Sequence, residues 1–501
     1  MTTNYGRVGS AVRLSGRQLV SVSIAALLST AMVATATSAA YAQSVDLSKW
    51  SPEYIKSIAG TEEVDTAKTC GAVVPLDYKG RLTYWWTGPN DASPDIERKI
   101  NDDFWKAWHE TYPNIETDAQ NIDYNQLLDK LRTALLGNAA PMVVRLQIVG
   151  GVEFASKDYF QELKPEDIGY ATTDFWPGAI KSNMWEGVEY GIPTNNETMA
   201  FIWNADIFKR AGLDPEKPPA TWDDVVSYSK QIHDKLGVAG YGLVARQNAG
   251  NTPFRFMPEL WAMGGGALDE ASDRPEYKTV ELNNEGSKKA LQQAYDMYVT
   301  DKSVPASALT NTQNENQQPF IAGQVAMMIA HPAEYAKMVD LAGKATGSDK
   351  AVADAVVANM RYGLIPEGSD RRAVVFGGSN MHFIKADYVD GGFDEQAAKA
   401  FACFWNSPEW STKLAWTGSN PGNLQGFKTK WMKERLDTIK FLDVTTSMLP
   451  SGIPFPVIPQ ATEIMNIIVP DMMQNALTGK MTVDEAADDA AQKVDDLLNG
   501  F

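Results

Sequence analysis

Three carboxylates stand in the turns or breaks that follow predicted strands, where acidic side chains can hydrogen-bond a bound molecule or transfer protons. Asp91 and Asp123 follow two predicted strands, and Glu197 ends the polar break Thr194–Glu197. Hydrolysis of a glycosidic bond would require two carboxyl groups at a fixed separation across a cleft, and the sequence pairs none of the three. Hydrogen bonding to a ligand is therefore one interpretation of Glu197, and an ordinary solvated loop glutamate is the other.

Other catalytic patterns are missing or isolated in the sequence. No G-x-S-x-G or H-E-x-x-H motif occurs, and the four histidines are scattered rather than grouped for metal binding. Ser227 and Lys230 form an S-x-x-K match, but nothing else typical of a serine acyltransferase accompanies them. We therefore expect no enzyme activity, no metal and no cofactor.

Strand and helix patterns alternate from residue 82 to residue 146. Strand-like runs cover 82–87, 115–120 and 142–146, and helical patterns cover 93–109 and 124–136. This βαβαβ order predicts a parallel sheet with helices on its faces. Ligands of such sheets bind beyond the carboxyl ends of the strands, which nominates Trp85, Trp86, Asn90, Asp91, Asp123, Tyr124 and Gln147. Because neighbouring strand residues face opposite sides, at least one of the two tryptophans is expected in the core.

Two further stretches indicate where the chain passes between lobes. Strand-like runs at 188–193 and 199–203 flank the polar residues Thr194–Glu197, as expected for a chain that leaves one lobe and enters another. Residues 447–460 contain four prolines and predict an extended last crossing. Gly377, Gly378 and Ser379 predict a close approach of the backbone to another group.

The N-terminus predicts export. Residues 1–42 contain a basic start, a short apolar run and the sequence Ala40-Tyr41-Ala42, typical of a signal peptide cleaved after Ala42. The remaining chain has 42 basic and 63 acidic residues, a formal charge of −21. We expect a soluble periplasmic protein that binds neither nucleic acid nor anionic lipid.

The segment 43–80 has no clear periodicity and predicts an N-terminal extension, packed on the first lobe or partly mobile. It contains Cys70, and the only other cysteine is Cys403. Export permits a disulfide. However, Cys403 lies on an apolar helical face, where a buried free thiol is common, and we favour the free thiol.

A series of short motifs resembles one protein family. In order along the chain they are Tyr190–Pro193, Trp203–Phe208, Ala211–Asp214, Thr221–Asp224, Phe320–Met328, Leu477–Lys480 and Glu485–Ala487. In this order, behind an export signal, the chain from about residue 81 to the C-terminus resembles the extracellular solute-binding proteins of ABC importers, family 1. That group contains the maltodextrin and multiple-sugar binders.

The resemblance implies an α/β fold of the two-lobe periplasmic-binding-protein kind, similar to type II. Each lobe would be a mainly parallel sheet flanked by helices, with three crossings between lobes. The first lobe would comprise residues 81–193 and 376–440, and the second 194–375 and 441–501. A monomer of this kind captures a carbohydrate or polyol by hinge closure and delivers it to the transmembrane subunits of an ABC permease.

The resemblance also suggests residues of the second lobe. Glu197 matches a cleft glutamate that hydrogen-bonds sugar hydroxyls, Phe254 matches an aromatic sugar contact, and Tyr335 matches a cleft aromatic residue. Met465 and Asn466 replace aromatic residues of maltodextrin binders, which favours a smaller or more polar sugar over a long glucan. The complete predicted ligand-binding set is Trp85, Trp86, Asn90, Asp91, Asp123, Tyr124, Gln147, Glu197, Phe254, Arg255, Tyr335, Gly378 and Ser379.

Two alternatives remain. Arg246, Arg255 and Arg372 could hold an anion such as a phosphorylated polyol, although ordinary surface arginines are the favoured interpretation. An exported glycan-cleaving enzyme could use the same aromatic and acidic residues.

Overall fold

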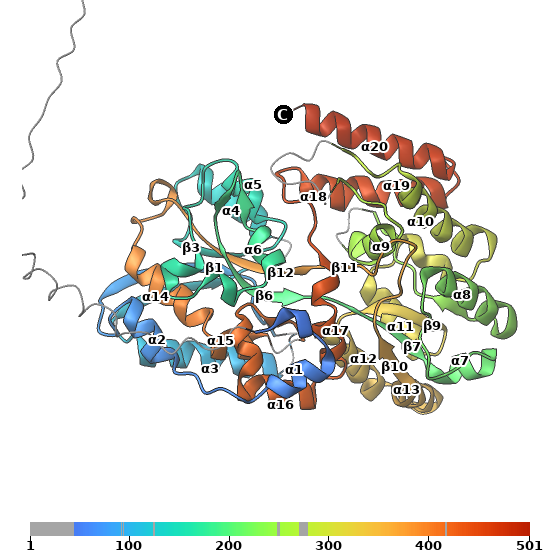
Figure 1. Ribbon diagram of the computed structural model, residues 1–501, viewed down its shortest axis with the longest axis horizontal. Coiled ribbons are helices and arrows are strands. Elements are labelled where there is room, and N and C mark those ends of the chain that lie inside the picture. Colours follow the sequence, from blue (N-terminus) through green and yellow to red (C-terminus); the bar gives the residue numbers. More distant parts are fainter. Residues whose placement is uncertain are drawn as a thin grey trace, which may run out of the picture. The chain divides into compact units, whose positions relative to one another are not determined.

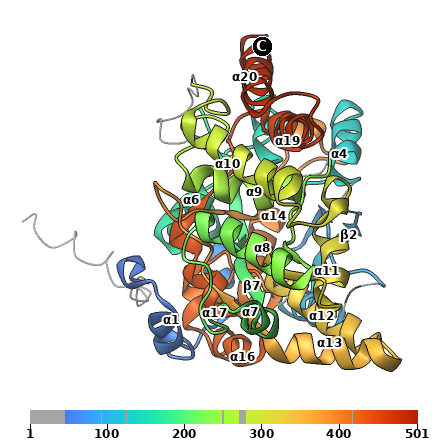
Figure 2. The same cartoon turned by 90° about the vertical axis from the view of Figure 1, so that its right-hand side faces the viewer.

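Two β-sheets flanked by helices organise the chain (Figures 1 and 2). The computed structural model describes residues 45–91, 93, 95–123, 126–247, 251–269, 279–415 and 418–500. We call the part around the six-stranded sheet the first lobe and the part around the four-stranded sheet the second lobe. Tyr124 lies outside the described residues.

The sheet of the first lobe contains the predicted βαβαβ unit. Its strand order is β13-β6-β12-β3-β1-β2, and β1 pairs in parallel with both β2 and β3. The bounds are β1 Gly80–Trp86, β2 Ile115–Asn121, β3 Val143–Gln147, β6 Ile192–Glu197, β12 Gly377–Phe383 and β13 Asn420–Pro421. The connecting helices are α3 (Asp95–Thr111) and α4 (Leu127–Leu136), which confirms the prediction for this stretch.

Burial explains why these segments form helices and strands. On α3, Phe104 and Trp108 face the core four residues apart, and on α4 Leu127, Leu131 and Leu135 do the same. The three parallel strands end at one edge of the sheet, and the polar residues that follow them are therefore brought together there.

The sheet of the second lobe has the order β10-β7-β9-β8. Its strands are β7 Ala200–Asn204, β8 Ala239–Tyr241, β9 Val325–Ala330 and β10 Met360–Gly363. Strand β7 is antiparallel to β9 and β10, whereas β8 is parallel to β9. Three strands thus share a direction, and helices such as α8 (Trp222–Leu236) cover the sheet (Figure 2).

The sheets were expected to be mainly parallel, and strands that follow a crossing from the other lobe depart from this. Strand β7 follows the first crossing, and β12, antiparallel to β3 and β6, follows the second. Hydrophobic patterns predict which residues are buried but not the side from which a strand enters its sheet. Adjacent pairs are consequently more often antiparallel than the prediction of mainly parallel sheets implied.

The three predicted crossings are present. The first runs from β6 through Thr198 and Met199 into β7, so the predicted lobe boundary at residue 193 falls inside β6. The second joins β11 (Val374–Val375) to β12 through Phe376, and the third leads from α17 (Leu442–Ser447) into β14 (Gly452–Ile453). Strands β11 and β14 pair in parallel, so the second and third crossings lie side by side.

The remaining helices complete both lobes. They are α1 Pro52–Ile58, α2 Thr66–Val73, α5 Gly151–Ala155, α6 Pro177–Lys181, α7 Ala205–Ala211, α9 Asn251–Ala262, α10 Glu285–Tyr295, α11 Gln313–Ile321, α12 Pro332–Lys344, α13 Gly347–Asn359, α14 Glu395–Trp405, α15 Pro408–Leu414, α16 Lys430–Thr438, α18 Ala461–Glu463, α19 Val469–Leu477 and α20 Val483–Asn499. Short strands β4 (Met184–Trp185) and β5 (Val188–Glu189) form a separate pair. Among the described residues, none of the helices has the length and apolar character needed to cross a membrane.

The N-terminal extension packs on the first lobe, and the expectation of a free thiol is wrong. Cys70 of α2 and Cys403 of α14 form a disulfide, with their Cα atoms 5.7 Å apart and both side chains buried. The apolar face that suggested a free thiol at Cys403 is the face against which α2 packs. A buried thiol and a buried disulfide need the same apolar surroundings, so the local pattern does not distinguish them.

Candidate functional site

A cavity of about 480 Å³ lies beyond the carboxyl ends of β1 and β3, at the place that the sheet topology predicts. Most lining residues belong to the first lobe, and Thr462 and Asn466 come from the segment after the third crossing. The lining comprises Trp86, Thr87, Gly88, Pro89, Ser93, Glu97, Ile100, Asn101, Leu127, Leu128, Arg145, Leu146, Gln147, Val149, Gly150, Thr194, Asn195, Glu197, Ser379, Trp405, Leu414, Ser419, Thr462 and Asn466.

Two indole rings form the aromatic part of the lining. Trp86, at the end of β1, packs edge-on against Trp405, with ring centroids 5.4 Å apart. The Arg145 guanidinium lies 5.8 Å from the centroid of the Trp405 ring. A Cβ atom at Gly88 would come within 2.6 Å of the Trp86 ring, so the turn after β1 needs glycine at this position.

A row of hydrogen bonds fixes the polar part of the lining. Arg145 donates through Nε to Thr194 Oγ1 (2.8 Å) and through Nη2 to Asn195 Oδ1 (2.7 Å). Asn195 Nδ2 then donates to Glu197 Oε1 (2.9 Å). Thr194 Oγ1 donates to the carbonyl oxygen of Ser379 (2.7 Å), which ties the row to β12. The row holds one guanidinium and one carboxylate at fixed positions beside the cavity.

The charges in the lining are influenced by burial. Burial lowers the pKa of Arg145, and the nearby Glu197 carboxylate partly opposes that effect. Burial raises the pKa of Glu97, opposed by the charge of Lys337. The charged residues in the lining are thus two carboxylates and one guanidinium.

Two polar atoms beside the cavity retain hydrogen-bonding capacity. Thr87 Oγ1 and Asn101 Oδ1 are buried, and neither has a hydrogen-bond partner within the described part of the chain. Buried polar atoms are nearly always satisfied in native proteins, by the protein, water or a ligand. Both residues line the cavity, so a bound polar molecule is a candidate partner for the Thr87 hydroxyl and the Asn101 amide oxygen.

Four residues of the predicted set line the cavity: Trp86, Gln147, Glu197 and Ser379. Gly378 is not part of the lining, but its backbone packs against Asn195, which is. Its φ is +140°, and a Cβ atom there would lie 2.2 Å from the Asn195 carbonyl oxygen. The close backbone approach predicted at Gly378 is therefore the contact of β12 with β6.

Other predicted residues of the first lobe lie outside the lining. Trp85 is only 8% exposed, faces away from Trp86, and carries the Lys130 ammonium 4.4 Å from its ring centroid. Asn90 and Asp91 lie further along the turn after β1, and Asp123 is exposed in the turn after β2. Strand alternation explains why only one of the two tryptophans reaches the cavity.

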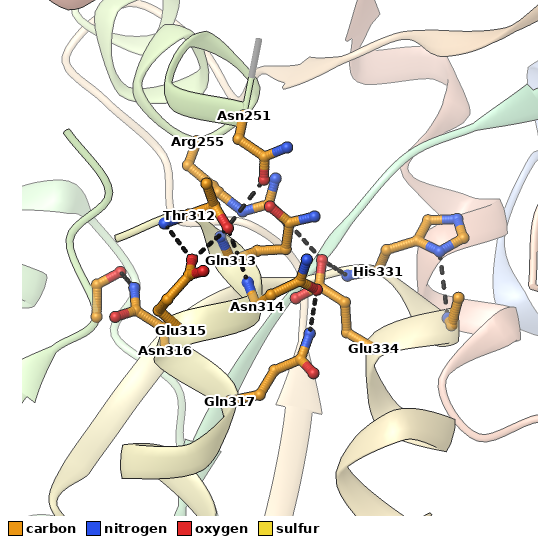
Figure 3. A network of polar contacts seen from close by, with 12 residues as sticks. Asn251, Arg255, Thr312, Gln313, Asn314, Glu315, Asn316, Gln317, His331 and Glu334 are labelled. Atoms are coloured by element: carbon orange, nitrogen blue, oxygen red, sulfur yellow. Dashed lines mark hydrogen bonds and ion pairs between the residues drawn. The ribbon is translucent and has the colours of Figure 1, made fainter. Parts of the chain in front are cut away.

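Phe254, Arg255 and Tyr335 of the predicted set lie in the second lobe and contact other protein groups, and none of them lines the cavity. Phe254 packs edge-on against Phe455 at 4.9 Å, and Tyr335 packs against Phe441 at 5.3 Å. Arg255 of α9 points toward Glu334 of α12 and forms an ion pair with it, next to His331 at the start of that helix (Figure 3).

Two of the three arginines suggested as ligands of an anion form ion pairs with glutamates of the protein. Arg255 is paired with Glu334, and Arg372 forms an ion pair with Glu367 at 2.7 Å. Arg246 is exposed. The guanidinium that does line the cavity is that of Arg145, whose charge interrupts the apolar run of β3.

Sequence reasoning missed several lining residues. A charged residue within a buried strand was a usable signal for Arg145. Trp405 ends an apolar helix, and Thr462 comes from a segment remote in the chain, so neither carries a local signal. Within the described residues, no group of three or more His, Cys, Asp or Glu side chains is placed to hold a metal ion.

Comparisons with known proteins agree with this architecture. The model of the family described as bacterial extracellular solute-binding protein matches residues 73–412. The sn-glycerol-3-phosphate-binding periplasmic protein UgpB of Escherichia coli is 22% identical over 409 residues, covering 76% of this chain and 84% of that protein.

Two solved structures extend the likeness to the fold. A solute-binding protein of an ABC transporter from Thermotoga lettingae, bound with α-D-tagatose, has a TM-score of 0.66 at 22% identity and covers 84% of this chain and 100% of its own. A maltose-bound protein from T. maritima has a TM-score of 0.66 at 21% identity and covers 83% of this chain and 100% of its own. At these identities the likeness shows the two-lobe fold alone.

Proposed function

Because the chain belongs to the family of bacterial extracellular solute-binding proteins, we propose that it is the periplasmic binding component of an ABC importer and that its solute is an uncharged carbohydrate or polyol. One observation carries the choice of solute. The cavity places the Trp86 and Trp405 rings beside the fixed row of Arg145, Asn195 and Glu197.

This combination matches the surface of a sugar. A sugar ring has apolar C–H faces, which pack on aromatic rings, and a hydroxyl edge, which needs donors and acceptors in pairs. A volume of about 480 Å³ is in the range of small-molecule sites. Asn466 contributes an amide where maltodextrin binders have an aromatic residue, which favours a short or polar solute over a long glucan.

The second candidate solute is a phosphorylated polyol, which differs from the first in carrying negative charge. That candidate is favoured by the likeness to UgpB and by the presence of Arg145 in the lining. However, Arg145 already donates to Thr194 and Asn195, and Glu97 and Glu197 would repel a phosphate. An uncharged solute avoids that repulsion.

The other parts of the proposal follow from the sequence and the family. An N-terminal signal cleaved after Ala42 directs the protein to the periplasm, where it acts as a monomer. The two lobes, close to the predicted 81–193 with 376–440 and 194–375 with 441–501 but with the first boundary after β6, close on the solute, and a permease recognises the closed form. No reaction on the solute is involved.

Mass spectrometry under native conditions is the direct test, performed on protein purified from its host without dialysis. A co-purified neutral hexose, disaccharide or polyol is the expected result. Calorimetric titration with a panel of neutral sugars and polyols, and with sn-glycerol-3-phosphate, then ranks the two candidates. Binding of the phosphate ester alone, weakening as salt is raised, would overturn the uncharged solute.

Glycan cleavage is tested on the same protein. Incubation with chromogenic glycosides is expected to give no turnover. Turnover that disappears in Glu197→Gln but persists in Glu162→Gln, an exposed glutamate outside the cavity lining, would establish an enzyme instead.

A further inference from the structure

The described part of the N-terminal extension before β1 (residues 45–79) lies almost entirely before the part of the chain that the family model matches, which begins at residue 73. It is fastened to the first lobe at several points. The disulfide joins Cys70 to Cys403, Glu62 forms an ion pair with Lys428 at 3.0 Å, and the Gly60 amide donates to the Lys428 carbonyl oxygen at 3.0 Å. This end of the extension is therefore a fixed part of the first lobe.

The other end of the extension reaches α17, just before the third crossing. Helix α1 packs beside α17 (Figure 1). Lys56 Nζ lies 2.7 Å from Asp443 Oδ2, and Trp50 Nε1 donates to the Thr446 carbonyl oxygen at 2.7 Å. The Trp50 ring also packs edge-on against Trp176, with centroids 5.3 Å apart.

Helix α17 is in contact with both lobes. Thr446 Oγ1 donates to Asn420 Oδ1 of β13 in the first lobe at 2.6 Å. Phe441, directly before α17, packs against Tyr335 and Tyr362 of the second lobe, at 5.3 and 4.9 Å. The Thr445 carbonyl oxygen accepts a hydrogen bond from Thr198, which lies in the first crossing. A change in the angle between the lobes must therefore move α17 relative to at least one of them.

A hydrophobic cluster connects the extension to the other crossings. Val45, Ile55 and Ala59 share this cluster with Phe376 of the second crossing and with Leu442 and Leu449, which flank the start of the third. The Phe376 amide donates to the Ile453 carbonyl oxygen at 2.9 Å, so the two crossings are joined at this point. Bending of the crossings would require this cluster to repack, because packed interiors hold few voids and switch between discrete arrangements.

We propose that residues 45–59 brace the crossings, with Trp50 and Lys56 as positioning residues that hold α17 against the first lobe and thereby set the equilibrium between arrangements of the two lobes. The extension is fixed to the first lobe by the disulfide, so its contacts with α17 favour the lobe angle in which those contacts are made. The brace would affect the affinity for any solute through the population of the binding-competent arrangement. The inference does not depend on which solute binds.

Distances between fluorophores on the two lobes test the brace without a ligand. Leu136 on α4 and Val352 on α13 are 80% and 44% exposed, and Leu136→Cys with Val352→Cys provides two labelling sites while both native cysteines remain in the disulfide. Single-molecule energy transfer on the doubly labelled protein reports the populations of lobe arrangements. Lys56→Met is expected to change their ratio about threefold, and Lys56→Met with Trp50→Phe about tenfold.

Glu62→Gln is the matched control, because it breaks an ion pair of the same extension that involves the first lobe only. It is expected to leave the distribution unchanged. A double-mutant cycle of Lys56→Met with Asp443→Asn should show that the two substitutions act on the same contact. An unchanged distribution in Lys56→Met would overturn the brace. So would an equal change in Glu62→Gln, because that result means general loosening. Lys56 is 54% exposed in its side chain, so Lys56→Met is expected to fold normally.

Discussion

Buried or half-buried polar groups of the two lobes differ in their partners. In the first lobe, Arg145, Asn195 and Glu197 bond to one another and still line the cavity. In the second lobe, Arg255 and Glu334 are each only 7% exposed and pair with each other, and neither lines the cavity. Residue type alone therefore does not tell which polar groups line the cavity. The first-lobe groups stand where strands end at a sheet edge, whereas the second-lobe pair joins two helices.

Removing one member of the second-lobe pair should produce the largest effect on stability. Arg255→Met leaves the Glu334 carboxylate buried without its partner, and we expect the free energy of unfolding to fall by about 4 kcal/mol. Urea denaturation measures this loss. Solute affinity, measured well below the unfolding transition, should change less than threefold. A fall in affinity of tenfold or more would show that Arg255 belongs to the binding site.

The double variant Arg255→Met with Glu334→Leu sharpens the test. It removes both charges from the same apolar surroundings and should recover most of the lost stability. If the double variant is as unstable as Arg255→Met, the loss does not come from an unpaired carboxylate.

A buried carboxylate of the second lobe should make stability depend on pH. Burial, with a contribution from Asp223, raises the pKa of Glu259 to about 8. Below about pH 4.5 the group is protonated in the folded and unfolded chains. Between pH 4.5 and 8 the unfolded chain releases the proton and the folded chain keeps it, so stability falls as pH rises. Glu259→Gln should therefore be about 4 kcal/mol more stable than the parent at pH 8 and nearly equal to it near pH 4.5.

Denaturation at pH 4.5, 6 and 8 measures this difference. Glu110→Gln, on the exposed part of α3, is the control and should follow the parent at every pH. A constant difference between Glu259→Gln and the parent would contradict the raised pKa, because a packing effect does not change with pH.

The parts of the site that the sequence predicted are those determined locally. Alternating strands and helices place Trp86 and Gln147 at one sheet edge, because parallel strands end together. The polar break predicted the position of Glu197. Trp405 and Thr462 reach the cavity through packing between segments distant in the chain, and no periodicity records that contact. The same reason explains the disulfide, whose cysteines are 333 residues apart.

The strand directions illustrate a second limit. Strand β7 was predicted as a strand from its apolar run, but its antiparallel direction follows from entering the second sheet through the first crossing. Direction depends on the path of the whole chain, whereas burial depends on the residues of the strand itself.

The cavity carboxylate should affect binding more than stability. Glu197→Gln keeps the shape and one acceptor but removes the charge beside Arg145, and we expect the affinity for the solute to fall about 30-fold, or about 2 kcal/mol. The free energy of unfolding should change by less than about 1 kcal/mol, because Glu197 is only partly buried. Calorimetric titration and urea denaturation measure the two quantities. A large loss of stability with unchanged affinity would place Glu197 with the structural pairs.

Two threonines of the lining provide the finest comparison, because their hydroxyls differ in the partners that they have within the described residues. Thr194 Oγ1 bonds to Arg145 and to the Ser379 carbonyl oxygen, whereas Thr87 Oγ1 has no partner within the described residues. Thr87→Val should leave stability unchanged or raise it by up to about 1 kcal/mol, while affinity falls about fivefold because the solute loses a hydrogen bond. Thr194→Val should cost about 1–2 kcal/mol of stability, because the Arg145 donor loses its acceptor. Equal behaviour of the two variants would mean that the Thr87 hydroxyl does not serve the solute, and the unsatisfied polar atoms would then say nothing about where it binds.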